Sequence, residues 1–190
     1  MSTVGERRFT SADLELLQHD DKRYEIIDGE LYVSTQPSWH HQAVGSRINT
    51  ALQVWSDESG AGQPAPAPGL IFSDDNDVAP DLVWISNERF AGALDKAGHL
   101  HTAPELVVEI LSPGKKNEDR DRNAKLDLYP RRGVHEYWIA DPRHSTIEVY
   151  RRQDAALQLV ATLQVGDTLQ TPLLPGFSAP LAQLFRRSLG

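Results

Sequence analysis

Hydrophobic residues recur along the chain with a helical period in some segments and as short continuous runs in others. The longest helical pattern predicts a helix over residues 38–59, followed by a glycine that would end it; its apolar positions are Val44, Ile48, Leu52 and Trp55. Weaker patterns predict three shorter helices, at residues 11–18, 117–132 and 180–187.

Short runs of aliphatic and aromatic residues predict strands. Two of these runs flank Asp28-Gly29, a pair suited to the tight turn of a β-hairpin. The run 105–111 is apolar except for its two glutamates, as expected of a strand buried on both faces. The predicted strands are 24–27, 31–33, 70–72, 81–85, 105–111, 134–140, 146–150, 157–162 and 168–173.

This order of elements favours an α/β (mixed α+β) fold with one central mixed β-sheet flanked by helices. At 190 residues the chain has the length of a single domain, and we expect one domain over 1–190. The one stretch that resembles a linker is 60–69, where Pro64, Pro66 and Pro68 predict a loop.

Composition excludes several classes of protein. With 39% hydrophobic and 24% charged residues, the chain is not a fully disordered tail. The absence of cysteine excludes disulfide scaffolds, cysteine metal sites and thiol nucleophiles, and fits a cytoplasmic protein. No segment is long and apolar enough to cross a membrane, and residues 1–10 lack the apolar core of a signal peptide.

Glu109 is the most informative residue, because it interrupts an apolar run that belongs in the core of a sheet. An ionised carboxylate in that setting costs several kcal/mol unless it is paired, hydrogen-bonded or bound to a metal. Strand periodicity places Glu105, Val107, Glu109 and Leu111 on one face of the sheet. A structural ion pair and a catalytic or metal-binding carboxylate both fit this position.

Asp81 is a second acid, at the start of a neighbouring predicted strand. An aspartate after a proline often only begins a turn. Two acids at the ends of adjacent strands can also converge on one divalent cation, and carboxylate oxygens favour hard ions such as Mg²⁺ or Mn²⁺.

Lys125 lies on the helix that follows the Glu109 strand. A lysine on a helix is commonly a solvated charge, but this segment is locally basic in a chain whose net charge is −8. A phosphate approaching the two acids would meet these cations. The segment holds seven basic residues against four acidic ones: Lys115, Lys116, Arg120, Arg122, Lys125, Arg131 and Arg132 against Glu118, Asp119, Asp121 and Asp127.

Together these residues resemble the Uma2 family of restriction endonucleases, a branch of the PD-(D/E)XK nuclease superfamily. The resemblance covers about residues 24–150. Its blocks are YEIIDGEL at 24–31, HQ at 41–42, PDLV at 80–83, VEILSP at 108–113, Lys125 with Tyr129, and GVHEYWIADP at 133–142.

The resemblance implies a restriction-endonuclease-like core in which Asp81 and Glu109 bind the metal. The superfamily pattern has a lysine two residues after the second acid, but Leu111 stands there, and the resemblance implies that Lys125 supplies the amine instead. Glu30 and His41 are candidate auxiliary groups, although a hairpin acid and a histidine at a helix start need no such role.

The resulting expectation is an endonuclease that uses Mg²⁺ or Mn²⁺ to hydrolyse DNA phosphodiester bonds, acting as a homodimer because duplex cleavage commonly uses two active sites. Two alternatives stay open. One is a catalytically inactive binding or regulatory protein that keeps the nuclease fold, which the acidic net charge and Leu111 favour. The other is a metal-dependent hydrolase of smaller phosphoesters.

Overall fold

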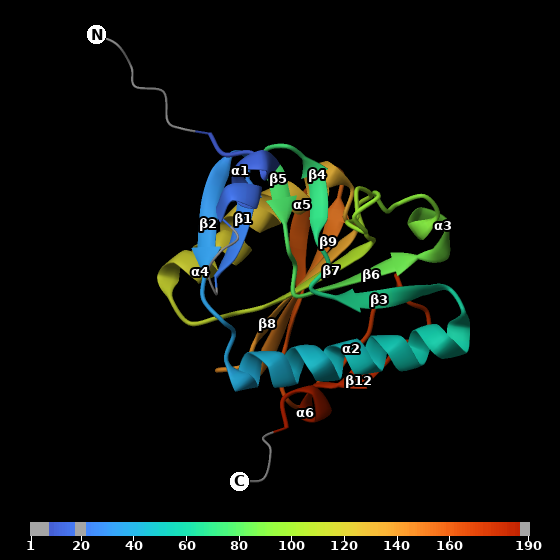
Figure 1. Cartoon of the computed structure of the whole chain (residues 1–190). Coiled ribbons are helices and arrows are strands. Elements are labelled where there is room, and N and C mark those ends of the chain that lie inside the picture. Colours follow the sequence, from blue (N-terminus) through green and yellow to red (C-terminus); the bar gives the residue numbers. More distant parts are fainter. Residues whose placement is uncertain (1–7, 18–21, 187–190) are drawn as a thin grey trace.

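A six-stranded mixed sheet forms the centre of the computed structural model, which describes residues 8–17 and 22–186 (Figure 1). Its strand order is β10-β9-β8-β7-β6-β3. Only β7 and β8 are parallel, and the other neighbouring pairs are antiparallel. The strands are β3 (Gly62–Pro66), β6 (Leu82–Ser86), β7 (Leu106–Ile110), β8 (Glu136–Asp141), β9 (Thr146–Gln153) and β10 (Ala156–Leu163).

The parallel pair requires a crossover, and a helical segment supplies it. This segment runs through α4 (Lys115–Asp119), the π-helical turn η1 (Arg120–Ala124) and α5 (Lys125–Arg132). It begins two residues earlier than the sequence predicts. Gly133 ends it in the left-handed conformation, with φ of 101°, which glycine adopts at little cost.

Different helices pack on the two faces of the large sheet. Leu106, Val108 and Ile110 pack toward α2 (Trp39–Ser59) and α6 (Leu181–Leu184), whereas Val107 and Leu111 pack toward α5. The alternation predicted for this strand is therefore confirmed. Helix α2 itself follows the sequence prediction closely, with the Ser38 side chain capping its start and Gly60 its end.

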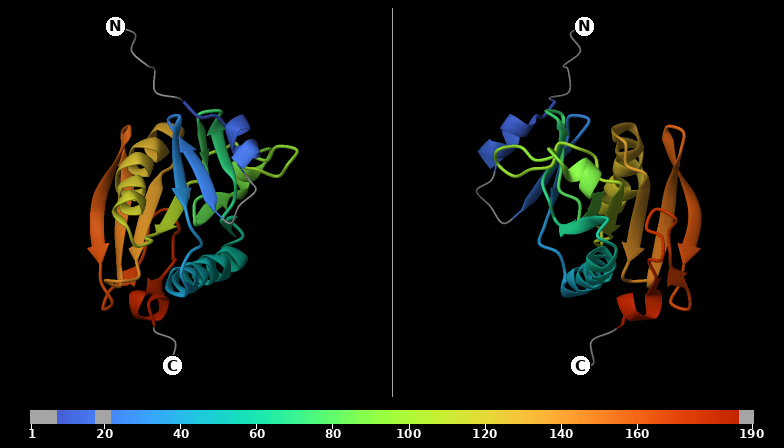
Figure 2. Two further views of the ribbon diagram at one scale, coloured as in Figure 1. Left: turned by 60° about the vertical axis from the view of Figure 1, so that its left-hand side comes forward. Right: turned by 90° about the vertical axis from the view of Figure 1, so that its right-hand side faces the viewer.

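A second, four-stranded sheet has the order β2-β1-β5-β4. Its hairpin turns at Asp28 and Gly29, whose φ angles of 50° and 78° fit the expected tight turn. Figure 2 shows this sheet and α5 on one side of the large sheet, opposite α2. Its elements, with the preceding helix, are α1 (Ser11–Leu17), β1 (Arg23–Ile27), β2 (Glu30–Ser34), β4 (Leu70–Ser73) and β5 (Asn76–Val78).

The prediction of a loop over residues 60–69 is wrong, because residues 62–66 form the edge strand β3. Its only neighbour is β6, with Pro64 opposite Trp84 and Pro66 opposite Leu82. An edge strand needs hydrogen bonds along one side only, so prolines two residues apart can both occupy positions whose nitrogens face away from the sheet.

The C-terminal prediction is also corrected. Instead of one strand over 168–173 there is a two-residue strand, β11 (Thr168–Leu169), which pairs with β12 (Ala179–Pro180) apart from the main sheet. Helix α6 is shorter than predicted. The short helix α3 (Asn87–Phe90) and β5 had no clear sequence signal.

The expectation for residues 1–7, and the predicted helix ends at Gln18 and Arg187, lie outside the described residues. Within the described residues no helix is both long and apolar enough to cross a membrane.

Close packing of β3 on β6 yields a stability prediction. A Cβ at Gly62 would press on the carbonyl oxygen of Ile85 and lie 2.8 Å from Cα of Ser86, so we expect Gly62→Ala to lower the free energy of unfolding by about 1–3 kcal/mol. Gly166 has open space around it, and Gly166→Ala is the matched control, expected to change stability by less than about 0.5 kcal/mol. Urea denaturation measures both; equal effects would contradict this packing.

Candidate active site

Glu109 lies on β7, on the face of the large sheet that α5 covers, with 1% of its surface exposed. Two groups from α5 contact it: Nζ of Lys125 at 2.8 Å and the hydroxyl of Tyr129 at 2.9 Å. Both donate to Oε1. Oε2 receives no hydrogen bond from the described residues, so one oxygen of this buried carboxylate is left for another ligand.

Asp81 immediately precedes β6, which pairs with β7 so that Leu82 stands opposite Val108. Extending this register by one residue places Asp81 opposite Glu109, and directly opposed residues of an antiparallel pair share a face. Oδ2 of Asp81 also accepts a hydrogen bond from the backbone N–H of Ile110 at 2.9 Å. The two acids selected from the sequence are therefore cross-strand neighbours.

Two cationic or polar side chains hold Asp81 in place. Arg23 of β1 donates to Oδ1 at 3.0 Å, and Nε2 of His41 from α2 lies 3.1 Å from Oδ2. Burial alone would raise the pKa of Asp81, but the hydrogen bond and charge of His41, the N–H of Ile110 and the charge of Lys125 together lower it below its usual value. These contacts favour the ionised form of Asp81.

A hollow of about 130 Å³ opens beside Asp81. Asp81 is its only acidic lining residue, and Arg23 and Arg120 contribute positive charge. Nδ1 of His41 is buried and has no hydrogen-bond partner among the described residues, which is uncommon for a buried ring nitrogen. The lining residues are Arg23, Ser34, Thr35, Gln36, Pro37, Ser38, His41, Asp81, Ser112, Pro113, Asn117 and Arg120.

Behind the hollow, the Lys125 ammonium is enclosed by carboxylates. It lies 2.8 Å from Oε1 of Glu25, 2.8 Å from Oε1 of Glu109 and 3.7 Å from Oδ1 of Asp121, with 1% of its side chain exposed. Burial opposes the charge, but Glu109 and Glu25 outweigh it and raise the pKa of Lys125. Lys125 is thus a buried, charged lysine and not a solvated one.

Glu25 completes this cluster from β1. It is 1% exposed, accepts the backbone N–H of Ala79 at 3.0 Å and pairs with Arg120 at 3.3 Å. Burial would raise the pKa of Glu25, but Lys125 and Arg120 lower it. Arg120 also binds Asp121, its neighbour in η1, at 2.8 Å.

Carboxylates outnumber permanent cations in this cluster. Four carboxylates face three permanent cations: Glu25, Asp81, Glu109 and Asp121 against Arg23, Arg120 and Lys125. Burial raises the pKa of Glu109, and the charges of Asp81, Asp121 and Glu25 raise it further against the opposing effect of Lys125. A further cation beside Glu109 would lower its pKa and favour the ionised carboxylate.

The carboxylates of Asp81 and Glu109 are the kind of oxygen ligand that Mg²⁺ prefers. No group of three or more His, Asp or Glu side chains in the described parts of the chain is arranged to hold a metal. Mg²⁺ needs only one or two carboxylates, however, with water and phosphate oxygens completing its shell. Asp81 and Oε2 of Glu109 are the groups that could hold it.

The structure separates the two auxiliary candidates. His41 lies at the site, in contact with Asp81. Glu30 is exposed on β2 and lines a different hollow, beside Lys115 and Lys116. Position 111, where the superfamily pattern has its lysine, is occupied by a buried leucine among apolar neighbours, whereas Lys125 reaches Glu109 from the helix.

Sequence reasoning missed Glu25 and Arg23, and it named Arg120 only as one of the basic residues of segment 115–132. Glu25 carried a usable signal, because it interrupts the apolar run YEII just as Glu109 interrupts its own strand. Arg23 had none, because its partner Asp81 lies far away in the sequence.

Comparison with known proteins identifies the family. The family model described as "Uma2: Putative restriction endonuclease" matches residues 11–182. The chain belongs to the Uma2 family. The resemblance drawn from the sequence is thereby confirmed.

Two further proteins are similar over most of the chain. The "Uncharacterized protein slr1290" of Synechocystis sp. is 26% identical over 163 residues, 82% of each protein. The crystal structure of a "putative nuclease belonging to DUF820" from Anabaena variabilis superposes with a TM-score of 0.74 at 18% identity, over 93% of this chain and 97% of that one. This likeness confirms the predicted fold class, with a mixed sheet flanked by helices.

The buried cluster predicts a large effect of one substitution in this Uma2 protein. Glu25→Gln removes a charge that compensates Lys125 and Arg120, and breaking such a buried pair costs about 3–5 kcal/mol of unfolding free energy. The matched control is Glu30→Gln on the neighbouring strand, where the side chain is exposed. Urea denaturation measures the difference; a loss below about 1 kcal/mol at Glu25 would contradict the cluster's role.

Proposed function

We propose that the protein is a metal-dependent endonuclease that hydrolyses DNA phosphodiester bonds. The observation that carries the proposal is the cross-strand pair of Asp81 and Glu109 beside a hollow lined by Arg23 and Arg120. The description of the Uma2 family as restriction endonucleases supports the same reaction class.

Asp81 and Glu109 would hold Mg²⁺ or Mn²⁺ at this site. When bound, the ion supplies Lewis acidity toward a phosphate oxygen and lowers the pKa of a coordinated water. The remaining contributions come from the chain. Arg23 and Arg120, which line the hollow, attract and orient the phosphate, and the ionised Asp81 fixes the position of His41.

Lys125 acts through Glu109 in this proposal. Its ammonium is buried and bonds to Oε1 of Glu109, so it holds one carboxylate oxygen of Glu109 and favours its ionised form. Lys125 is therefore a positioning residue. Tyr129 fixes the same oxygen from the next turn of α5.

Cleavage of plasmid and single-stranded DNA with Mg²⁺ or Mn²⁺ tests the proposal. We expect Asp81→Asn and Glu109→Gln each to lower the rate by about 10²-fold or more, because each removes a carboxylate charge from the site. Glu30→Gln is the matched control and should cleave like the wild type. Equal cleavage by the wild type and both site variants would assign the activity to a contaminant and contradict the proposal.

An alternative is a nuclease-fold protein that binds or regulates without catalysis. One observation favours it: each acid already has a cationic partner, Arg23 on Asp81 and Lys125 on Glu109. The two functions differ in whether a divalent ion joins these pairs.

We also propose a homodimer, formed through the free edge of the large sheet. Strand β10 lies at that edge and exposes Leu159 and Val160, at 53% and 40%. Light scattering of the full chain should give twice the monomer mass, and we expect Leu159→Lys to halve it. A monomer at high concentration would contradict this proposal.

A further inference from the structure

The basic residues of segment 115–132 are largely engaged within the protein. Arg120 and Lys125 belong to the buried cluster, Arg122 pairs with Glu148, and Arg131 pairs with Asp28 at 2.6 Å. The local positive charge that the sequence suggested as a phosphate-binding surface is thus mostly neutralised. In that segment only Lys115 and Lys116 are exposed without an ion pair to a described residue.

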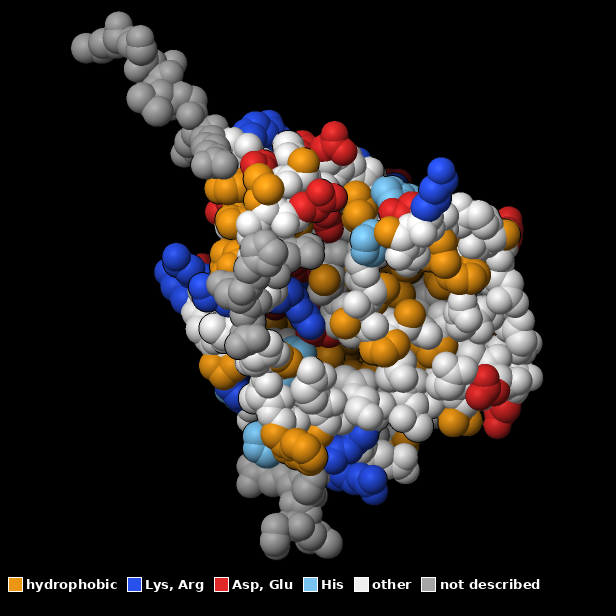
Figure 3. Space-filling view, in the orientation of Figure 1, with side chains coloured by type: hydrophobic (Ala, Val, Ile, Leu, Met, Phe, Trp, Pro, Cys, Tyr) orange, Lys and Arg blue, Asp and Glu red, His pale blue; other side chains and the backbone are white. Residues whose placement is uncertain are grey.

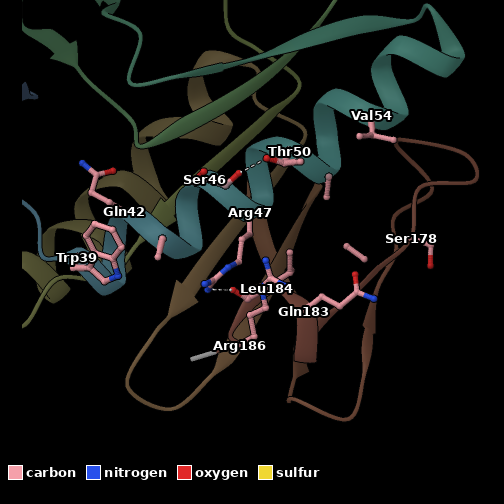
Figure 4. A pocket seen from close by; sticks show the side chains of 13 residues that line it. Trp39, Gln42, Ser46, Arg47, Thr50, Val54, Ser178, Gln183, Leu184 and Arg186 are labelled. Atoms are coloured by element: carbon pink, nitrogen blue, oxygen red, sulfur yellow. Dashed lines mark hydrogen bonds between the residues drawn. The ribbon is translucent and has the colours of Figure 1, made fainter. Parts of the chain in front are cut away.

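A larger groove lies between α2 and the segment that leads into α6 (Figure 4). Its volume is about 850 Å³. Among the residues that the structure describes, the lining contains two arginines and several polar side chains but no acidic residue, in a chain of net charge −8. The polar and charged lining residues are Gln42, Ser46, Arg47, Thr50, Ser178, Gln183 and Arg186.

The arginines are placed to meet an anion. Arg47 is anchored by a hydrogen bond of 3.2 Å from its Nη1 to the carbonyl oxygen of Leu184, and Arg186 is exposed on the opposite wall. Neither forms an ion pair with a described residue. Figure 3 shows basic side chains gathered at this end of the molecule, over α2 and α6.

Trp39 lines the same groove at the start of α2 and is 74% exposed. Such exposure is unusual for tryptophan, whose large apolar surface is normally covered. Exposed aromatic rings beside basic grooves are the platforms on which unpaired bases stack. Ser38, which caps α2, and His41, two residues after Trp39, line the hollow at Asp81, so the groove and the hollow both involve the N-terminal end of α2.

We propose that this groove binds a single-stranded segment of DNA. A base stacks on Trp39, and backbone phosphates pair with Arg47 and Arg186. The assignment rests on the proposed nuclease function for its biological meaning, but the binding it describes requires no cleavage. Charge complementarity between an acid-free groove and the phosphate backbone favours this occupant over an acidic protein surface, which would offer no base to Trp39.

The test is equilibrium binding of the full chain to a fluorescent oligothymidylate in EDTA, where cleavage cannot occur. We expect Trp39→Ala to weaken binding roughly 10-fold and Trp39→Phe to restore most of it, because phenylalanine keeps a stacking face. We expect the double variant Arg47→Ala/Arg186→Ala to reduce the slope of log K against log salt by about 1.4, since each contact to a single strand contributes about 0.7.

Lys96→Ala is the matched control, because Lys96 is exposed and lies outside the groove. Equal weakening by Lys96→Ala and the arginine variant would mean unspecific attraction and overturn the proposal. Tighter binding of duplex than of single strands, with no effect of Trp39→Ala, would overturn it as well. So would light scattering showing that Trp39→Ala dissociates a dimer, since a second copy would then occupy the groove.

The result also separates this proposal from the proposed function. Retained, Trp39-dependent binding in a protein that never cleaves would leave the groove assignment intact and remove the nuclease. Metal-dependent cleavage that is lost in Asp81→Asn but unchanged in Trp39→Ala at limiting substrate would support the nuclease function and overturn the groove assignment.

Discussion

One buried ammonium connects the main parts of this molecule. Lys125 projects from α5 and lies 2.8 Å from Glu25 of the small sheet and 2.8 Å from Glu109 of the large sheet. A charged group so deeply enclosed is stable only while acceptors from both sheets are held in place around it. The crossover helix, the hairpin and the central strand therefore have to assemble in one register, and the same contacts fix the carboxylate of Glu109.

The site is built on this arrangement. Pairing of β6 with β7 sets Asp81 opposite Glu109, and the π-helical turn η1 carries Arg120 and Asp121 into the same cluster. Carboxylates outnumber permanent cations in this cluster, and Oε2 of Glu109 receives no hydrogen bond from the described residues.

The elements that were predicted correctly from the sequence are those that local periodicity and turn chemistry determine. The hairpin at Asp28-Gly29, the helix α2 and the alternation of β7 followed directly from residue types. Sequence reasoning failed at β3, because prolines are compatible with a strand only at a sheet edge, and edge position is a property of the assembled sheet.

Part of the site was predictable because it also depends on a local signal. A lone acid in an apolar run is a local signal, and it identified Glu109; applied to β1 it would have identified Glu25 too. The cations had a weaker signal or none. Arg23 meets Asp81 across 58 positions of sequence, and Lys125 was one of seven basic residues in its segment until the family resemblance singled it out, since nothing local distinguishes a buried lysine from an exposed one.

We propose that Asp81 and Glu109 share a divalent cation. The anomalous difference map of a crystal soaked in Mn²⁺ tests this, because it locates the ion itself. We predict a peak within coordination distance of both carboxylates, with Lys125 still bound to Oε1 of Glu109. A saturated crystal with no peak there, and with the Arg23–Asp81 and Lys125–Glu109 pairs unchanged, would contradict the claim.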